Sequence, residues 1–186
     1  CFVYNCQQDW RNTKIDRARA GYDYFMPLDG TFRDNVTLQI KNGPMDFQVR
    51  EPVSPLIGGL QHTHIAVEFQ IAQEYTGQQR HVCYLMPWFR QILDFDMHTR
   101  PNGDAHVRAL IQGAGNGMVA VTNTGNDENW TGHDLAAANL YGFGRLSYDT
   151  TLDPAVIAGE WVRLTFGNNE PVEKTLDRIL MQSWPT

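Results

Sequence analysis

The run Ile65-Ala66-Val67-Glu68-Phe69-Gln70-Ile71 decides the fold class of this chain. It is short, rich in β-branched and aromatic residues, and almost continuously apolar, which is typical of a strand in a parallel sheet. Similar runs are Val36 to Lys41 and Met118 to Thr122, and Cys1 to Asn5 indicates a fourth strand. Because helical patterns or long loops separate these runs, the sequence predicts repeating strand–helix units of the α/β class.

The helices are expected between these strands and after the last of them. Their predicted ranges are 13–25, 79–93, 105–112, 133–141, 154–165 and 171–182. Asp153 followed by Pro154 predicts the start of one helix, since aspartate favours the N-cap and proline the first helical position. Residues 44–63 are rich in proline and glycine, so we expect them to form a long loop.

The number of strands indicates an incomplete barrel. Four strand–helix units in 186 residues are about half of a (β/α)8 barrel, which usually takes about 250 residues. The chain also starts inside the apolar run Cys1 to Tyr4 and stops where a helical pattern ends. We therefore expect a segment of a longer protein, folded as half of a (β/α)8 (TIM) barrel with about four parallel strands and their helices.

The composition restricts the partners of the protein. Its net charge is −6 and its pI about 5.4, so no nucleic-acid partner is expected, because phosphate backbones require a basic face. No stretch approaches the roughly 20 apolar residues of a membrane span, and no membrane partner is expected. Cys1, Cys6 and Cys83 do not resemble a disulfide framework, which favours the cytoplasm, while sequons at Asn35 and Asn129 leave secretion as the alternative.

Polar and aromatic side chains follow the predicted strands at their carboxyl ends, where (β/α)8 barrels carry their chemistry. They are Arg11, Lys41, Asp46, Glu74 and Trp130. Lysine and arginine pair with carboxylates, and an indole ring stacks on the apolar face of a sugar, so the set suggests a site for a sugar acid. Each residue alone has a plainer interpretation as a turn residue, a solvated charge or a packed ring.

Three longer motifs make the prediction more specific. They lie within residues 40–56, 73–85 and 129–146 and include Lys41-Asn42-Gly43-Pro44-Met45-Asp46, Gln73-Glu74-Tyr75-Thr76-Gly77 and Asn129-Trp130-Thr131-Gly132-His133. All three closely resemble motifs of the α-glucuronidases of glycoside hydrolase family 67. The likeness spans nearly the whole chain, with a less typical stretch around residues 98–117.

The resemblance implies the C-terminal half of the barrel, strands five to eight. Residues 1–186 would then form part of one glycoside hydrolase catalytic domain, with no second domain. The implied reaction is the hydrolysis, with inversion, of α-1,2-linked glucuronic acid or its 4-O-methyl ether from xylo-oligosaccharides during xylan degradation. Asp46 and Glu74 match two carboxylates that share the role of general base, and Lys41 matches a lysine that binds the uronate carboxylate. The family's general acid is a glutamate after strand four, expected upstream of Cys1, so the segment alone is expected to be inactive.

The resemblance also implies which partners and cofactors to expect. The partners are xylo-oligosaccharides that carry glucuronic acid, no cofactor or metal is expected, and a homodimer is one form expected of the full-length parent. Arg11 is a further candidate for binding the substrate carboxylate, and Trp130 is a candidate for stacking on a sugar ring.

Two other functions stay open at this point. One is a non-catalytic, carbohydrate-binding half barrel. The other is a metal-dependent hydrolase, because His62-Thr63-His64 places two imidazoles on one face of an extended segment. This pair precedes its strand, at the end opposite the expected site, and no carboxylate cluster joins it. A packed or solvated pair of histidines is therefore the plainer interpretation.

Overall fold

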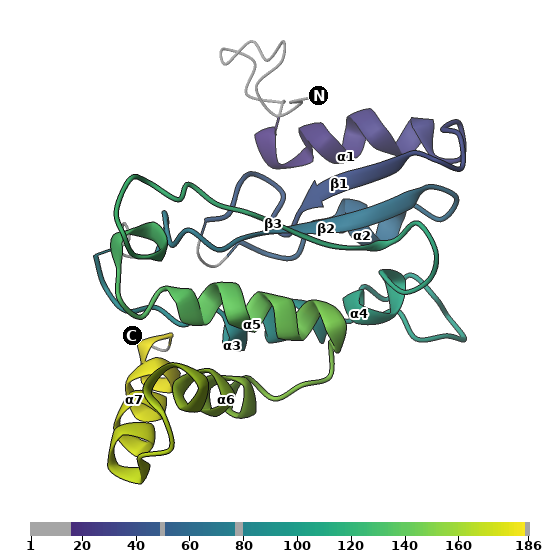
Figure 1. The fold of residues 1–186 in the computed structure, drawn as a ribbon. Helices are drawn as coiled ribbons and strands as arrows, with labels where there is room; N and C mark the ends of the chain where they lie inside the picture. Colours follow the sequence, from purple (N-terminus) through teal and green to yellow (C-terminus); the bar gives the residue numbers. More distant parts are fainter. Residues whose placement is uncertain (1–15, 49–50, 77–79, 185–186) are drawn as a thin grey trace. The chain divides into compact units, whose positions relative to one another are not determined.

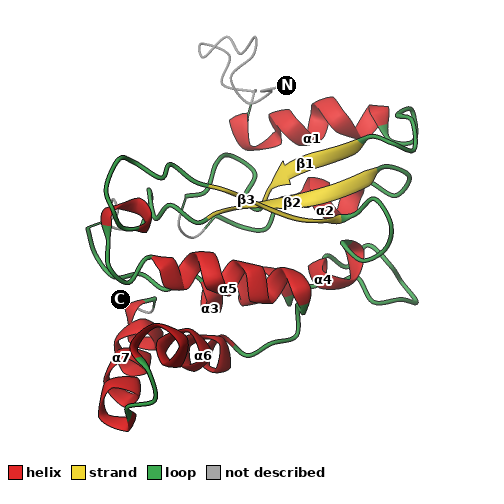
Figure 2. Cartoon of the chain, in the orientation of Figure 1, coloured by secondary structure: helices red, strands yellow, loops and turns green. Residues whose placement is uncertain are grey.

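The computed structural model describes residues 16–48, 51–76 and 80–184 and shows an α/β chain (Figures 1 and 2). The chain divides into two compact units. The first consists of Cys1–Phe69 with Asp94–Val119, and the second of Gln70–Leu93 with Ala120–Thr186. The strand predicted at residues 1–5 lies outside the described residues.

Three strands form one sheet in the order β1-β2-β3. Their bounds are Thr37–Lys41 for β1, His64–Gln70 for β2 and Gly117–Val121 for β3. Each lies within one residue of its predicted position, so the short apolar runs were a sufficient signal for these strands.

The strands run parallel. β1 and β2 are paired in parallel, with Lys41 opposite Glu68. At the start of β2 the Ile65 N–H donates to the Asn116 side-chain oxygen at 2.8 Å. Because Asn116 immediately precedes β3, the amino ends of β2 and β3 lie side by side and the two strands share a direction. This confirms the α/β class with a parallel sheet, while the half barrel stays a prediction.

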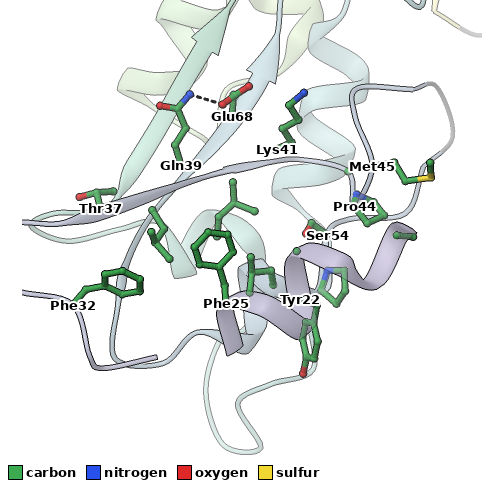
Figure 3. A pocket seen from close by; sticks show the side chains of 17 residues that line it. Tyr22, Phe25, Phe32, Thr37, Gln39, Lys41, Pro44, Met45, Ser54 and Glu68 are labelled. Atoms are coloured by element: carbon green, nitrogen blue, oxygen red, sulfur yellow. Dashed lines mark hydrogen bonds between the residues drawn. The ribbon is translucent and has the colours of Figure 1, made fainter. Parts of the chain in front are cut away.

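The sheet has an apolar face and a polar face. Val67 and Phe69 of β2 are fully buried, and residues two apart on a strand share a face. Glu68 points to the other face, together with Gln39 and Lys41 of β1, as Figure 3 shows. The polar face carries the candidate binding residue Lys41.

The helices of the first unit are short. They are η1 (Arg17–Arg19), α1 (Ala20–Phe25), η2 (Met26–Leu28), α2 (Pro55–Gly59) and α4 (Val107–Leu110). The prediction of an unbroken loop over 44–63 was wrong at α2. Pro55 supplies the fixed backbone angle of a first helical residue, and the next residues, Leu56 and Ile57, are buried. Tertiary burial therefore outweighs the loop-like composition here.

The helices of the second unit are longer. They are α3 (Met86–Leu93), η3 (Trp130–Gly132), α5 (Ala137–Tyr148), α6 (Pro154–Phe166) and α7 (Glu170–Ser183). The last two lie within one residue of their predicted ranges. The helix predicted over 133–141 instead begins at Ala137 and continues to Tyr148. The helix predicted over 79–93 begins late, at Met86. No helix within the described ranges is long and apolar enough to cross a membrane.

The late start of α3 has a physical cause. The side chain of Asn139 on α5 accepts the Leu85 N–H at 2.8 Å and donates to the Cys83 carbonyl at 2.9 Å. The Tyr84 N–H donates to the Ser183 hydroxyl at 2.8 Å. These side chains satisfy backbone groups that a helix would otherwise pair, so the segment stays non-helical up to Met86.

The start of α6 agrees with the prediction. The Asp153 carboxylate accepts the Ala155 N–H at 2.7 Å, with proline at the first helical position. α6 packs against α7, and Ile157, Trp161 and Leu180 are buried in this unit. The N-cap therefore starts a helix whose apolar side contributes to the core of the second unit.

Candidate active site

An ion pair lies just beyond the carboxyl end of β1. The Lys41 ammonium donates to the Asp46 carboxylate at 2.6 Å, and both side chains are about one-quarter exposed. Lys41 is the last residue of β1, and Asp46 lies in the loop that follows. Two of the predicted site residues therefore meet at the predicted end of the strand. Partial burial strengthens such a pair relative to one in open solvent.

The loop after β1 remains attached to the sheet. The Asn42 N–H donates to the Glu68 carbonyl at 3.0 Å, which continues the parallel pairing past the end of the strand. The Asn42 carbonyl accepts the Ser54 N–H at 2.8 Å. The beginning and the return of the loop are thus joined by a hydrogen bond, and the segment that carries Asp46 lies between them.

An aromatic ring lies beside the lysine. The Lys41 ammonium is 4.5 Å from the centroid of the Phe47 ring, and Phe47 itself is buried. A cation at this distance from an aromatic face gains a favourable contact of about 0.5–1 kcal/mol at exposed sites, and more when desolvated. The Asp46 carboxylate and the Phe47 ring therefore both contact the Lys41 ammonium group.

A second polar pair lies on the same face of the sheet. The Gln39 amide donates to the Glu68 carboxylate, one strand across (Figure 3). Sequence reasoning missed this pair, although the alternation of polar residues along β1 and β2 could have indicated it.

A cavity of about 520 Å³ is lined by β1, α1 and the loop after β1. Tyr22 and Phe25 of α1 form part of its wall, with Met45 of the loop. In Figure 3 the Lys41 ammonium points away from Tyr22 and Phe25. The apolar part of the cavity therefore lies across β1 from the Lys41–Asp46 pair, and we do not assign it to the sugar site.

Glu74 belongs to the second unit, in a turn after β2. Its carboxylate accepts the Gln70 side-chain amide at 2.7 Å. The preceding residue, Gln73, has a φ of 58°, a left-handed conformation that costs a non-glycine residue about 1–2 kcal/mol. Gln73 is buried, and its amide donates to the His81 carbonyl at 3.1 Å. The buried amide keeps the strained turn in place, and the turn presents Glu74.

The other two predicted site residues are Trp130 and Arg11, and the structure describes only Trp130. Trp130 starts the short helix η3 in the second unit and is partly buried. Its indole N–H is buried without a hydrogen-bond partner within the described residues. The next residue, Thr131, is buried with a φ of 54°. Arg11 lies outside the described residues, so its role stays a prediction.

Comparisons with known proteins decide the family. Residues 1–130 match the Glycosyl hydrolase family 67 middle domain, and residues 131–186 match the Glycosyl hydrolase family 67 C-terminus. The chain belongs to glycoside hydrolase family 67. The resemblance drawn from the three motifs is thereby confirmed.

Relatives of this family 67 chain occur in several Aspergillus species. The chain is 46% identical over 192 residues to a probable alpha-glucuronidase A of Aspergillus fumigatus, with 99% of the chain and 22% of that protein covered. It is 44% identical over 189 residues, with the same coverage, to a probable alpha-glucuronidase A of Aspergillus niger and to an alpha-glucuronidase A of Aspergillus tubingensis. The chain thus spans less than a quarter of the length of these relatives.

The histidine pair lies at the other end of β2. His64 is the first residue of β2, one residue before the predicted start of the strand at Ile65, and its ring lies against Gly115. The backbone N–H of His62, two residues earlier, donates to the Asp29 carboxylate. Within the described parts of this family 67 chain, no group of three or more histidine, cysteine, aspartate or glutamate residues could hold a metal ion.

The cysteine of the second unit is buried. Cys83 is a free thiol with 8% of its surface exposed. Burial raises the pKa of the Cys83 thiol, and the nearby Thr76 side chain offsets only part of this. Since the thiolate is the reactive form, Cys83 is a packing residue, as predicted.

Proposed function

We propose that the protein to which this chain contributes is an α-glucuronidase, which removes glucuronic acid or its 4-O-methyl ether from xylo-oligosaccharides. The observation that carries the proposal is the match to family 67 along the whole chain, together with relatives that are named alpha-glucuronidases. The Lys41–Asp46 pair at the end of β1 supports it with a geometry suited to an acidic sugar.

The proposed reaction inverts the configuration at the anomeric carbon. Asp46 and Glu74 act together as the general base on one water molecule. A glutamate upstream of this chain protonates the leaving oxygen. An inverting enzyme needs about 6.5–9.5 Å between its acid and base carboxyl groups, so that a water molecule fits on the far side of the sugar. Both carboxylates follow the carboxyl ends of adjacent parallel strands, which is where barrel enzymes carry their chemistry.

Lys41 is proposed to select the acidic sugar. In the structure its ammonium binds the carboxylate of Asp46. A bound uronate would provide a further carboxylate for the same cation, a charge-assisted contact that a neutral sugar cannot make. Arg11 is proposed as a further ligand of the uronate, and Trp130 as a surface on which a sugar ring stacks.

The proposed fold of the full-length protein is a closed (β/α)8 barrel, to which this chain contributes strands five to eight. The polar face of β1 and β2 supports this arrangement. Parallel sheets are normally covered on both faces, and the row formed by Gln39, Lys41 and Glu68 suits the inner face of a barrel at the end that carries the site.

The test uses the full-length protein and an aldouronic acid as the substrate. Wild-type protein should release the uronic acid, and proton NMR at early times should show the inverted anomer first. Asp46→Asn and Glu74→Gln should each lower kcat on the order of a hundredfold or more. Release with retention, or wild-type turnover in both variants, would contradict the proposal.

The isolated 186-residue chain should show no turnover, because the acid is supplied from elsewhere. If it binds xylo-oligosaccharides, and the full-length protein also binds without turnover, a non-catalytic sugar-binding function would replace this one.

A further inference from the structure

We propose that Glu51 is a positioning residue for Asp46, which it holds through the backbone of the loop and not through a contact with substrate. The proposal rests on the assignment of Asp46 as a catalytic carboxylate. No family motif or spacing rule assigns a role to Glu51. Its carboxylate binds backbone N–H groups, whereas the carboxylate of Asp46 binds the Lys41 ammonium.

Glu51 binds two consecutive backbone amides at the site. The Met45 N–H donates to Oε2 at 3.0 Å, and the Asp46 N–H donates to Oε1 at 3.2 Å. Consecutive N–H groups that converge on one anion form a small concave binding site, and bonds to a carboxylate are stronger than neutral ones. The side chain of Glu51 therefore fixes the peptide from which the Asp46 side chain projects toward Lys41.

Gly43 leaves room for this carboxylate. A Cβ atom at position 43 would lie 2.1 Å from Oε2 of Glu51 and 3.0 Å from its Cβ and Cδ atoms. The Glu51 side chain thus lies directly against the Gly43 backbone, and any side chain at position 43 would displace it. Two positions distant from one another in the motif are therefore coupled by one close contact.

Among the described residues, at least three sets of contacts therefore hold the loop. Asn42 binds β2 and Ser54 at the base of the loop, Glu51 binds the amides of Met45 and Asp46, and the Lys41 ammonium binds the Asp46 carboxylate. Removing Glu51 leaves the hydrogen bonds of Asn42 and the Lys41–Asp46 ion pair in place. It releases the backbone of Asp46, the proposed general base. Small displacements of a catalytic group can cost about a hundredfold in rate.

The same unit contains a matched control. The Asp29 carboxylate accepts the N–H groups of two consecutive residues, Gln61 and His62, at 2.9 and 3.1 Å. It is therefore the same kind of backbone-binding carboxylate as Glu51. It lies before the amino end of β2, whereas Glu51 serves the loop after the carboxyl end of β1. Loss of Asp29 should remove comparable hydrogen bonds without touching the Asp46 loop.

The experiment compares kcat, KM and Tm for variants of the full-length protein on an aldouronic acid. Glu51→Ala should lower kcat by at least about tenfold and change KM less than about threefold, because the base is misplaced while the substrate contacts stay. Glu51→Gln retains an oxygen acceptor of the same reach and should recover most of the lost kcat. Asp29→Ala should lower Tm by a similar amount and leave kcat within about twofold of wild type.

A double-mutant cycle tests whether Gly43 and Glu51 affect kcat through the same contact. Gly43→Ala should lower kcat in the same way as Glu51→Ala, since it displaces the same carboxylate. The Gly43→Ala/Glu51→Ala double variant should be no worse than the single variants, because two changes that break one interaction are not additive. Additive losses would show that Gly43 acts independently of Glu51 and would contradict the inference.

Other outcomes overturn the proposal separately from the assigned function. If Asp46→Asn is inactive but Glu51→Ala retains kcat within about twofold, the function stands and the positioning role fails. If Asp29→Ala loses as much kcat as Glu51→Ala for the same loss of Tm, Glu51 contributes general stability alone. If the wild-type protein releases no uronic acid, the assigned function fails first. Should Glu51→Ala not fold, Glu51→Gln and Gly43→Ala still decide the question through their kcat values.

Discussion

Asn139→Ala is expected to loosen the segment that leads into α3. Asn139 is 1% exposed and binds the Leu85 N–H and the Cys83 carbonyl at 2.8 and 2.9 Å. Alanine leaves both backbone groups buried without this partner, and each unsatisfied group costs about 1–3 kcal/mol. We expect a loss of about 2–6 kcal/mol in local stability, which corresponds to at least about a thirtyfold larger equilibrium constant for opening of the segment, given a tenfold change per about 1.4 kcal/mol.

Hydrogen exchange followed by mass spectrometry on the full-length protein measures this opening directly. Peptides that cover residues 80–90 should exchange faster in Asn139→Ala. Asn139→Asp retains the acceptor for Leu85 and should give an intermediate rate. Asn169→Ala removes an exposed N-cap of α7, costs about 1 kcal/mol, and should leave the 80–90 peptides unchanged. Unchanged exchange of these peptides in Asn139→Ala would refute the view that this side chain prevents an earlier start of α3.

Three further predictions concern single side chains. Lys41→Ala in the full-length protein should raise KM for the acidic substrate more than it lowers kcat, and an unchanged KM would remove Lys41 from the binding site. Partial burial raises the pKa of Asp29, but hydrogen bonds from Gln61, Thr63 and His62 outweigh it, and the pKa lies below its usual value. The stabilisation by Asp29 is therefore complete above its unfolded pKa of about 3.9 and is lost as the pH falls through the lower folded pKa. The stability difference between wild type and Asp29→Asn in denaturant titrations should thus shrink between about pH 5 and pH 2, and a difference independent of pH would contradict this. Cys83 should resist a thiol reagent at pH 8 until the protein is unfolded, as measured by peptide mass spectrometry, and rapid native labelling would show that the burial is wrong.

The strands were predictable because their signal is local. A short, nearly continuous apolar run between turn residues has few alternatives to a buried parallel strand, and β2 matches such a run almost residue for residue. The start of α6 was equally local, since Asp153 caps the helix and Pro154 begins it. Where the deciding interaction lies within a few residues, sequence reasoning gave the correct boundary.

The errors have a common cause in contacts between distant residues. α3 begins late because Asn139 and Ser183 bind backbone groups of residues 83–85 from other helices. α2 forms within a proline- and glycine-rich stretch because Leu56 and Ile57 become buried. Local propensity identifies neither the side chains that bind residues 83–85 nor the burial of Leu56 and Ile57. The boundaries of these two helices therefore required the structure.

The residues of the candidate site likewise separate into those that local sequence predicts and those that depend on contacts with distant residues. Strand-end reasoning and the family motifs placed Lys41 and Asp46 together, because both depend on a strand whose end is visible in the sequence. The role of Glu51 is different, since a glutamate next to an arginine in a loop indicates an ion pair or a loop anchor, and the sequence does not show which groups it binds. Its function depends on which N–H groups converge on it and on the absence of a side chain at Gly43. A backbone-binding carboxylate is therefore identified by its donors, and the double-mutant cycle between positions 43 and 51 tests that identification without reference to any relative.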